Sequence, residues 1–219
     1  MSVLHRDILP PPQRRLFAEL GAVPGRFVLY GGTAIALQLG HRVSIDFDFF
    51  TSGPLDAESL YRQVSWLAEA QPLRQAPDTL TVRVDREGPV KLSFFATPML
   101  RQLRQPLALA QPSIRMASLL DLAGTKASVV QQRAEAKDYL DLHALIQSGI
   151  SLPLALSAAR AIFGARFEPQ STLKALSFFG DGNLATLDPE VKARLVADVR
   201  GVDLDQLPDP GLAASGIGA

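Results

Sequence analysis

Two aspartates that lie two positions apart, Asp46 and Asp48, carry the strongest chemical signal in the chain. They alternate with bulky apolar residues over residues 44–50, SIDFDFF, which is the period-two pattern of a β-strand. On a strand both carboxylates point to one face, about 7 Å apart along the backbone. Two carboxylates this close repel each other unless a cation lies between them or one is protonated. The pair therefore predicts a divalent metal site, and Mg²⁺ is the usual ion where phosphates also bind.

A second signal is the tripeptide Gly31-Gly32-Thr33, which lies between an apolar strand pattern and a helix pattern. Glycines let the backbone approach a ligand closely, and a helix N-terminus offers free N–H groups to a phosphate. The Thr33 hydroxyl could donate to a phosphate oxygen. By itself the tripeptide fits equally well a tight turn with Thr33 as the helix cap. His41, just downstream, fits either a structural hydrogen bond in its loop or a contact to nucleotide or acceptor.

A third group of charged residues lies in the second half of the chain. Lys126 and Arg133 are seven positions apart and share a helix face if that helix is unbroken. Cations there could neutralise a triphosphate or a leaving pyrophosphate. Asp138 and Asp141 are three apart and are also neighbours on a helix. A solvated face, or ion pairs such as Arg133 with Asp138, is the alternative.

The elements that must position these residues fall into two classes along the chain. The first part predicts an α-β-α-β-α-β-β order, and the part from residue 113 onward predicts helices and no strand. We therefore expect an α+β protein with lobes at residues 1–112 and 113–200 and a flexible tail at 201–219. The expected strands are 27–30, 45–50, 80–84 and 90–95. The expected helices are 11–21, 33–39, 56–70, 113–132, 135–147, 153–163, 169–179 and 189–200.

Composition places the chain among ordinary soluble globular proteins, with 47% hydrophobic and 20% charged residues in 219. The absence of cysteine excludes disulfides and thiolate metal sites and is compatible with a cytoplasmic enzyme. A formal net charge of zero argues against a strongly basic nucleic-acid binder, although a local basic patch stays open. Residues 1–13 do not read as a signal peptide, and no apolar run approaches the ~20 residues of a membrane span.

The sequence of residues 31–50, GGTAIALQLGHRVSIDFDFF, resembles the signature of the AbiEii/AbiGii toxin family. These proteins are nucleotidyltransferases of the DNA polymerase β-like superfamily. The similarity continues at residues 90–95, VKLSFF, then from residues 121–126, DLAGTK, to Arg133, and at residues 137–142, KDYLDL. It covers roughly residues 25–147.

This resemblance implies a mixed-sheet nucleotidyltransferase lobe followed by a helical lobe, with the active site in the cleft between them. It implies Mg²⁺ at Asp46 and Asp48 and an NTP as substrate. Asp138 would assist the acceptor or orient a lysine. The residues implied in nucleotide binding are Gly31, Gly32, Thr33, Lys126 and Arg133, and those implied in catalysis are Asp46, Asp48, Lys126 and Asp138.

One position departs from the wider superfamily. A third carboxylate usually comes from a neighbouring strand and shares a second metal ion. Here that strand is expected at residues 90–95, where Ser93 is in register. A two-metal mechanism with three carboxylates is therefore not the only one that the sequence allows. One-metal catalysis, or a base supplied by Asp138, is equally open.

The resemblance also implies a biological role. The chain is expected to transfer NMP to an RNA or tRNA end or to a protein, as the toxin of a type IV-like toxin–antitoxin or phage abortive-infection system with a cognate antitoxin. The alternatives are a small-molecule nucleotidyltransferase and a catalytically silent module that binds nucleotide or a partner.

Overall fold

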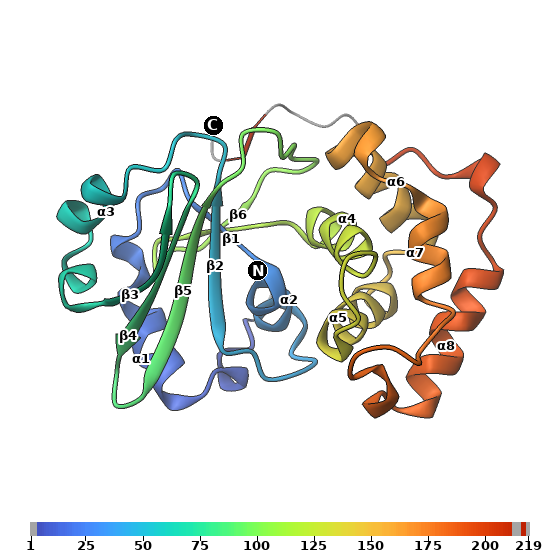
Figure 1. Ribbon diagram of the computed structural model, residues 1–219, viewed down its shortest axis with the longest axis horizontal. Helices are drawn as coiled ribbons and strands as arrows, with labels where there is room; N and C mark the ends of the chain where they lie inside the picture. Colours follow the sequence, from blue (N-terminus) through green and yellow to red (C-terminus); the bar gives the residue numbers. More distant parts are fainter. Residues whose placement is uncertain (1–3, 212–215, 218–219) are drawn as a thin grey trace.

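A single mixed sheet forms one side of the molecule and a set of helices forms the other (Figure 1). The computed structural model describes residues 4–211 and 216–217. The sheet has seven strands in the order β3-β4-β5-β2-β1-β7-β6. Two neighbouring pairs, β2 with β5 and β1 with β7, are parallel, and the remaining pairs are antiparallel. The strands are β1 Val28–Tyr30, β2 Asp46–Thr51, β3 Gln71–Ala76, β4 Thr79–Asp85, β5 Pro89–Ala96, β6 Leu107–Ala108 and β7 Arg115–Met116.

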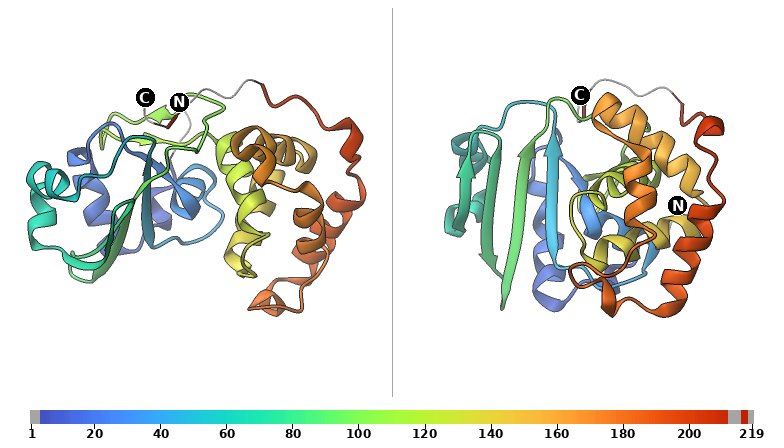
Figure 2. Two further views of the ribbon diagram at one scale, coloured as in Figure 1. Left: turned by 45° about the horizontal axis from the view of Figure 1, so that its top comes forward. Right: turned by 45° about the vertical axis from the view of Figure 1, so that its right-hand side comes forward.

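The helices that follow β7 all lie on the same side of the sheet, as the views of Figures 1 and 2 agree. Helix α2 lies between this group and the sheet, in contact with β1, β2, α4 and α5. The expected α+β class is confirmed. The helices are α1 Pro11–Glu19, α2 Gly31–Leu39, α3 Ala57–Gln63, α4 Leu119–Val129, α5 Ala136–Gln147, α6 Leu152–Phe163, α7 Pro169–Ala175 and α8 Pro189–Arg200.

Alternation along β2 separates the core from the side that faces the helices. Phe47 and Phe49 are fully buried on one face, whereas Asp46, Asp48 and Phe50 are half-buried on the other. The core face is held by aromatic packing, with the Phe49 ring 5.6 Å from that of Phe94 on β5. Such a pair contributes about 0.5–1.5 kcal/mol beyond its buried area. This burial fixes the strand register, because a slip by one residue would turn both carboxylates into the core.

Helix α4 is placed by its cap and by a glycine. The Ser118 hydroxyl accepts a hydrogen bond from the Asp121 backbone N–H at 3.1 Å and starts the helix. A Cβ on Gly124 would lie 2.8 Å from Cδ1 of Ile162, so only glycine lets α4 and α6 pack this closely. The close packing supports α4 from the side that faces away from the sheet.

Three parts of the predicted element map are wrong. The helix expected over 56–70 stops at Gln63, because Val64 is extended (φ −111°, ψ 94°), and a 3₁₀ turn follows at Ser65–Glu69. Strand β3 was not predicted, because its side chains are nearly all exposed and show no apolar alternation. The segment after residue 113 is not purely helical, because β7 pairs with β1 before α4 begins at Leu119.

The segment expected to be a flexible tail contains ordered structure among its described residues. A 3₁₀ turn forms at Leu204–Gln206. Ile217 is fully buried, and its carbonyl accepts hydrogen bonds from the Ser52 backbone N–H at 2.9 Å and the Ser52 hydroxyl at 2.8 Å. Residues 212–215 and 218–219 of that segment lie outside the described residues.

Within residues 4–211 and 216–217, no single helix has the length and apolar character to cross a membrane. One pair, Ala136–Gln147 with Leu152–Arg166, meets those criteria only jointly, across a bend of 113°.

Candidate active site

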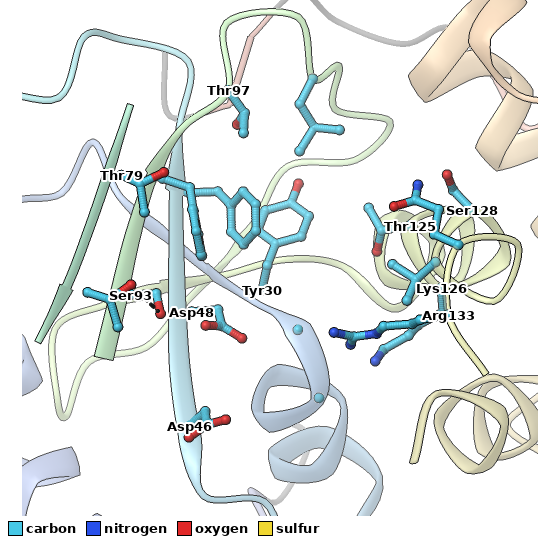
Figure 3. A pocket seen from close by; sticks show the side chains of 18 of the residues that line it. Tyr30, Asp46, Asp48, Thr79, Ser93, Thr97, Thr125, Lys126, Ser128 and Arg133 are labelled. Carbon is cyan, nitrogen blue, oxygen red and sulfur yellow. Dashed lines mark hydrogen bonds between the residues drawn. The ribbon is translucent and has the colours of Figure 1, made fainter. Parts of the chain in front are cut away.

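The face of the sheet that looks toward α4 is graded along its strands. Across β2 and β5, Asp46 pairs with Lys91, Asp48 with Ser93, and Phe50 with Phe95. Along the strands, the paired side chains on this face change from two charged groups, to a carboxylate with a hydroxyl, to two aromatic rings. A cavity of about 600 Å³ lies between this face and α4, so it is lined from both sides of the molecule (Figure 3).

Asp46 and Asp48 lie together on this face, as the strand pattern predicts. Burial raises the pKa of Asp48, and the negative charge of Asp46 raises it further, although Lys91, Ser93 and Lys126 partly offset the shift. Asp46 is more exposed, and its Oδ2 atom lies 3.1 Å from Nζ of Lys91. Two carboxylates that repel each other at the wall of a cavity have the donor chemistry of a hard divalent cation site.

The residue paired with Asp48 on β5 is not an acid. Ser93 stands opposite Asp48, and its hydroxyl oxygen lies 3.4 Å from the Thr81 hydroxyl on β4. In the part of the chain that the structure describes, Asp46 and Asp48 are the two carboxylates that line the cavity. No group of three or more His, Cys, Asp or Glu side chains suited to one metal ion occurs among those residues.

The two glycines bring the N-terminus of α2 against the carboxylates. Gly31 has φ of +72°, and a Cβ there would lie 3.0 Å from Oδ2 of Asp48. A Cβ on Gly32 would lie 2.3 Å from Nη2 of Arg42 and 3.1 Å from Oδ2 of Asp141. Both positions therefore need glycine, one for its conformation and both for space. The free backbone N–H groups of this helix end lie at the cavity wall.

Thr33 does not present its hydroxyl to the cavity as expected. Its side chain is buried, and its hydroxyl donates to the Asp46 carbonyl and lies 2.7 Å from the Ser44 hydroxyl. The single hydroxyl proton is therefore engaged in fastening the start of β2 to α2. A contact from Thr33 to a phosphate would have to come from its backbone N–H.

Lys126 on α4 is held between two buried carboxylates. Its Nζ atom lies 2.5 Å from Oδ1 of Asp138 and 2.7 Å from Oδ2 of Asp141, and its side chain is only 7% exposed. An ammonium group has three N–H donors, so one remains after these two bonds. Lys126 lines the cavity and lies close enough to Asp48 to influence its ionisation.

Arg133 also binds Asp138, but it is not on the helix of Lys126. Helix α4 ends at Val129, so the expected shared helix face does not exist. Instead, Arg133 reaches from the following loop, with Nε 2.7 Å from Oδ2 of Asp138 and Nη2 3.1 Å from Oδ1. The proposed ion pair is thus present, and the half-exposed guanidinium still lines the cavity.

Asp141 joins residues from three elements and was not among the predicted site residues. It accepts hydrogen bonds from Nε of Arg42 at 2.6 Å and Nη2 of Arg42 at 2.8 Å, and Nε2 of His41 lies 2.8 Å away. With Lys126, these contacts tie the loop between α2 and β2 to α4 and α5. His41 thus makes a structural hydrogen bond, although its partner lies on α5 rather than in its own loop.

The charges of this cluster do not cancel. Lys126, Arg133 and Arg42 carry three positive charges, and Asp138 and Asp141 carry two negative ones. Glu135, which lies 3.6 Å from Arg133, and Lys137, which lies 2.8 Å from Glu135, add one charge of each sign, so one positive charge remains in excess. Burial disfavours the ionised form of both carboxylates and so raises their pKa values. Hydrogen bonds outweigh this effect and hold both pKa values below their usual range. The donors are Arg133 and Lys126 for Asp138, and His41 and Arg42 for Asp141. A smaller cavity of about 280 Å³, lined by Gly32, Arg42, Asp48, Lys126 and Arg133 among others, faces this surplus of positive charge.

The lowered pKa of Asp141 predicts a pH dependence of its contribution to folding. A carboxyl whose pKa is lower in the folded protein stabilises the fold above its unfolded pKa of about 3.9 and loses that contribution as the pH falls toward the folded value. We expect the stabilising contribution of the Asp141 carboxylate, measured as the difference in unfolding free energy between the wild type and Asp141→Asn, to be present at neutral pH. It should shrink below about pH 4, by up to about 1.4 kcal/mol per pH unit.

Urea titrations of both proteins across this range measure the difference directly. Subtracting one unfolding free energy from the other cancels the contributions of Asp48 and Asp121, which are present in both proteins. Burial raises the pKa values of these two carboxyls, so their contributions change with pH in the opposite sense. A difference that stays flat down to pH 2.5 would contradict the lowered pKa.

Comparison with known proteins identifies the family. Residues 14–210 match the sequence model of the family described as "Nucleotidyl transferase AbiEii toxin, Type IV TA system". This chain belongs to the AbiEii family. A curated relative from Aquifex aeolicus (strain VF5), "Uncharacterized protein aq_aa25", is 39% identical to it over 129 residues, which are 55% of this chain and 58% of that protein. The match thus spans little more than half of that relative's length.

Two solved structures share the fold of this AbiEii-family chain. A crystal structure assigned as a nucleotidyltransferase from H. pylori has a TM-score of 0.55 and 18% identity, covering 85% of this chain and 89% of that one. "MenT4, nucleotidyltransferase toxin Rv2826c" from Mycobacterium tuberculosis H37Rv has a TM-score of 0.55 and 17% identity, covering 87% of this chain and 82% of that one. At these identities the likeness establishes the nucleotidyltransferase fold.

The predicted site residues of the AbiEii-family chain largely converge on one place. The glycine turn, both aspartates, Lys126 and Arg133 all line the larger cavity, and Figure 3 shows Asp48 on the sheet facing Lys126 and Arg133 across it. Asp138 lies behind Lys126 rather than at the surface of the cavity. Sequence reasoning missed Asp141 and Arg42 as a pair. The signal for Asp141 was its spacing of three from Asp138, but nothing in the sequence named its partner about 100 positions upstream.

Proposed function

We propose that this chain transfers a nucleoside monophosphate from an NTP to an acceptor hydroxyl. One observation carries the proposal: a glycine turn at a helix N-terminus, a pair of carboxylates and a held lysine meet at one cavity. Each matches a part of the reaction. Backbone N–H groups and cations bind phosphates, and carboxylates bind the metal ion that accompanies them.

The carboxylate pair fits Mg²⁺ by its chemistry. Asp48 is buried beside another carboxylate, so a cation there would relieve both the burial cost and the repulsion. Mg²⁺ in nucleotide sites is usually held by one or two carboxylates together with substrate phosphates and water. Asp46 and Asp48 would supply these ligands, and the ion would stabilise negative charge at the reacting phosphate.

The remaining residues would place the triphosphate. The N–H groups at the start of α2 bind phosphate oxygens, aided by the positive end of the helix dipole. Lys126 offers its third N–H, and Arg133 offers the exposed part of its guanidinium. Asp138 is buried, bound to both cations and low in pKa, so we assign it to positioning Lys126 rather than to accepting a proton.

The reaction itself is an in-line displacement at the α-phosphorus. The acceptor oxygen forms a bond to phosphorus as the bond to the pyrophosphate oxygen breaks, and the acceptor hydroxyl releases its proton to solvent water. Negative charge accumulates on the departing pyrophosphate, next to the surplus positive charge around Lys126. Preorganised cations at such a position lower the barrier without rearranging during the reaction.

The acceptor we favour is an RNA end or a protein hydroxyl, and the role we favour is that of a toxin restrained by a cognate antitoxin in the cytoplasm. The family assignment supports this role. The cavity rim supports an anionic ligand despite zero net charge, because Arg74, Lys91, Arg133 and Lys137 all line it. Phosphate binding depends on such local positive potential.

A catalytically silent nucleotide-binding module is the second candidate. Two observations favour it, namely Ser93 in the place of a third carboxylate and the ammonium of Lys91 on Asp46. A small-molecule nucleotidyltransferase is the remaining alternative. The proposed enzyme and these two alternatives differ in whether they transfer a labelled nucleotide and in which acceptor receives it.

A transfer assay tests the proposal. Each of the four α-labelled NTPs is incubated with Mg²⁺ and the protein, together with total RNA, total protein or a small-acceptor fraction. We expect label in RNA or protein, and we expect EDTA to remove it. Label in the small-molecule fraction alone would favour the small-molecule enzyme. NTP binding without any transfer would favour the silent module, and the absence of both would refute the proposal.

A further inference from the structure

Two phenylalanines on the cavity face of the sheet are not fully explained by the core or by phosphate chemistry, although Phe50 packs partly against the core. Phe50 and Phe95, here called the aromatic shelf, are paired in register across β2 and β5. Their ring centroids are 4.9 Å apart with planes inclined by 35°. Phe47, Phe49 and Phe94, on the opposite face of the same strands, are fully buried. The shelf is only half-buried and lines the larger cavity.

The shelf is supported from one side so that it presents a broad surface. The ring of Tyr30 on β1 lies 5.3 Å from that of Phe50, and Tyr30 itself is buried. An aromatic surface that stays half-exposed at the wall of a cavity is costly to keep in contact with water, because its burial would be favourable. Its retention at this wall points to a flat apolar ligand.

Hydroxyl-bearing residues line the same cavity as the shelf. Thr79 is paired with Phe95 across β4 and β5, Thr97 also lies on the sheet side, and Thr125 and Ser128 lie on α4 at the opposite wall (Figure 3). The opposite wall also contributes the apolar side chains of Val129 and Phe163. A slot with aromatic faces and hydroxyl edges matches a planar heterocycle that stacks on its face and forms hydrogen bonds along its edge.

The shelf lies at a suitable distance from the carboxylates. Phe50 follows Asp48 by two residues on the same face, which corresponds to about 7 Å along the strand. A nucleotide separates its phosphate from its base by one ribose, which spans a gap of this order. A phosphate at the Asp46–Asp48 pair therefore leaves its own base, or the base of a nucleotide that attacks it, in reach of the shelf.

We propose that Phe50 and Phe95 form a nucleobase-binding shelf beside the carboxylate pair. This inference rests on the proposed function and adds the site that takes the base. The base belongs either to the NTP or to an RNA acceptor, and the chemistry of recognition is the same for both. Phe50 and Phe95 stack against it. The hydroxyl oxygens of Thr79, Thr97 and Thr125, whose protons are donated within the protein, accept hydrogen bonds from its edge.

The test uses leucine, which keeps the apolar volume but removes the ring. Phe50→Leu and Phe95→Leu are compared with Phe50→Tyr and Phe95→Tyr, which keep a ring, and with Phe178→Leu, which removes an exposed ring (60% exposed) outside this cavity. Isothermal titration measures the affinity for each NTP with Mg²⁺, for inorganic tripolyphosphate and for the four free nucleosides. Thermal melting confirms that each variant is folded, and Phe95→Met serves where a leucine variant fails to fold.

If the base is that of the NTP, the leucine variants should bind their preferred NTP about 10-fold more weakly, within the roughly 5- to 150-fold range expected for one base stack. Tripolyphosphate affinity should be unchanged, and the tyrosine and Phe178→Leu variants should resemble the wild type. If the base is that of the acceptor, NTP affinity should be unchanged and KM for an RNA acceptor should rise by a similar factor.

Two results would overturn the shelf. One is an equal loss of affinity for tripolyphosphate and NTP, which would mean that the substitutions disturb the cavity as a whole. The other is the absence of any effect on NTP, nucleoside or RNA acceptor. Free nucleosides separate this inference from the proposed function, because binding to the wild type but not to the leucine variants supports the shelf even if no transfer occurs.

Discussion

Asp48→Asn should reduce nucleotidyl transfer by about 10³-fold while leaving the protein at least as stable as the wild type. The loss of activity follows from removing the more buried of two carboxylates that would hold the metal ion, and groups that stabilise charge at a reacting centre typically account for about 10²–10³-fold in rate. The effect on stability has the opposite sign to that of most buried substitutions. Burial and Asp46 raise the pKa of Asp48, so its ionised form opposes folding at neutral pH, and a neutral amide of the same shape removes that cost.

The measurements are initial transfer rates with labelled NTP and melting temperatures at pH 7. Asp7→Asn is the matched control, because Asp7 is exposed and lies outside both cavities near the carboxylate pair. A melting temperature several degrees below that of the wild type would show that Asp48 stabilises the fold. Retained transfer would remove the carboxylate pair from the mechanism.

Asp141→Ala should destabilise the protein by about 3–5 kcal/mol and also abolish transfer. The carboxylate is fully buried and bonded to Lys126 and Arg42, with His41 beside it, and removing one partner of a buried ionic cluster typically costs this much. For a chain of this size each kcal/mol corresponds to about 2–4 °C, so we expect the melting temperature to fall by about 6–20 °C. Activity should fall because Lys126 loses one of its two anchors.

Chemical denaturation of Asp141→Ala and of the control Asp7→Ala measures the first effect. Transfer rates well below the melting temperature measure the second. Asp141→Asn separates charge from shape, because the amide keeps the volume and can still accept a hydrogen bond. A loss of less than 1 kcal/mol in the alanine variant would mean that the cluster does not hold the fold together.

The sequence alone predicts the part of the site that depends on local periodicity. The alternation around Asp46 and Asp48 specifies a strand with both acids on one face. The glycine turn is equally local, because it lies directly between β1 and α2. These features are visible because neighbours in sequence decide them.

The parts that could not be predicted depend on contacts between distant segments. Asp141 meets Arg42 across 99 positions, and no periodicity links them. Strand β3 exists because β4 pairs with it, although its own side chains show no apolar alternation. The Thr33 hydroxyl was expected at a ligand, but Ser44 and the Asp46 carbonyl engage it once the two elements pack. In each case tertiary structure decides between alternatives that the local sequence leaves equal.

The cluster around Asp141 has a mechanical consequence. His41 and Arg42 belong to the loop that leads into β2, whereas Lys126 and Asp141 belong to α4 and α5, so a single buried carboxylate fastens the two walls of the cavity together. Separating the walls would leave the Asp141 carboxylate buried without Arg42 or without Lys126. This link resists any motion that would widen the cavity. Arg133 and Lys137, whose side chains are about half exposed, line the same cavity, so they can change conformation without breaking the link.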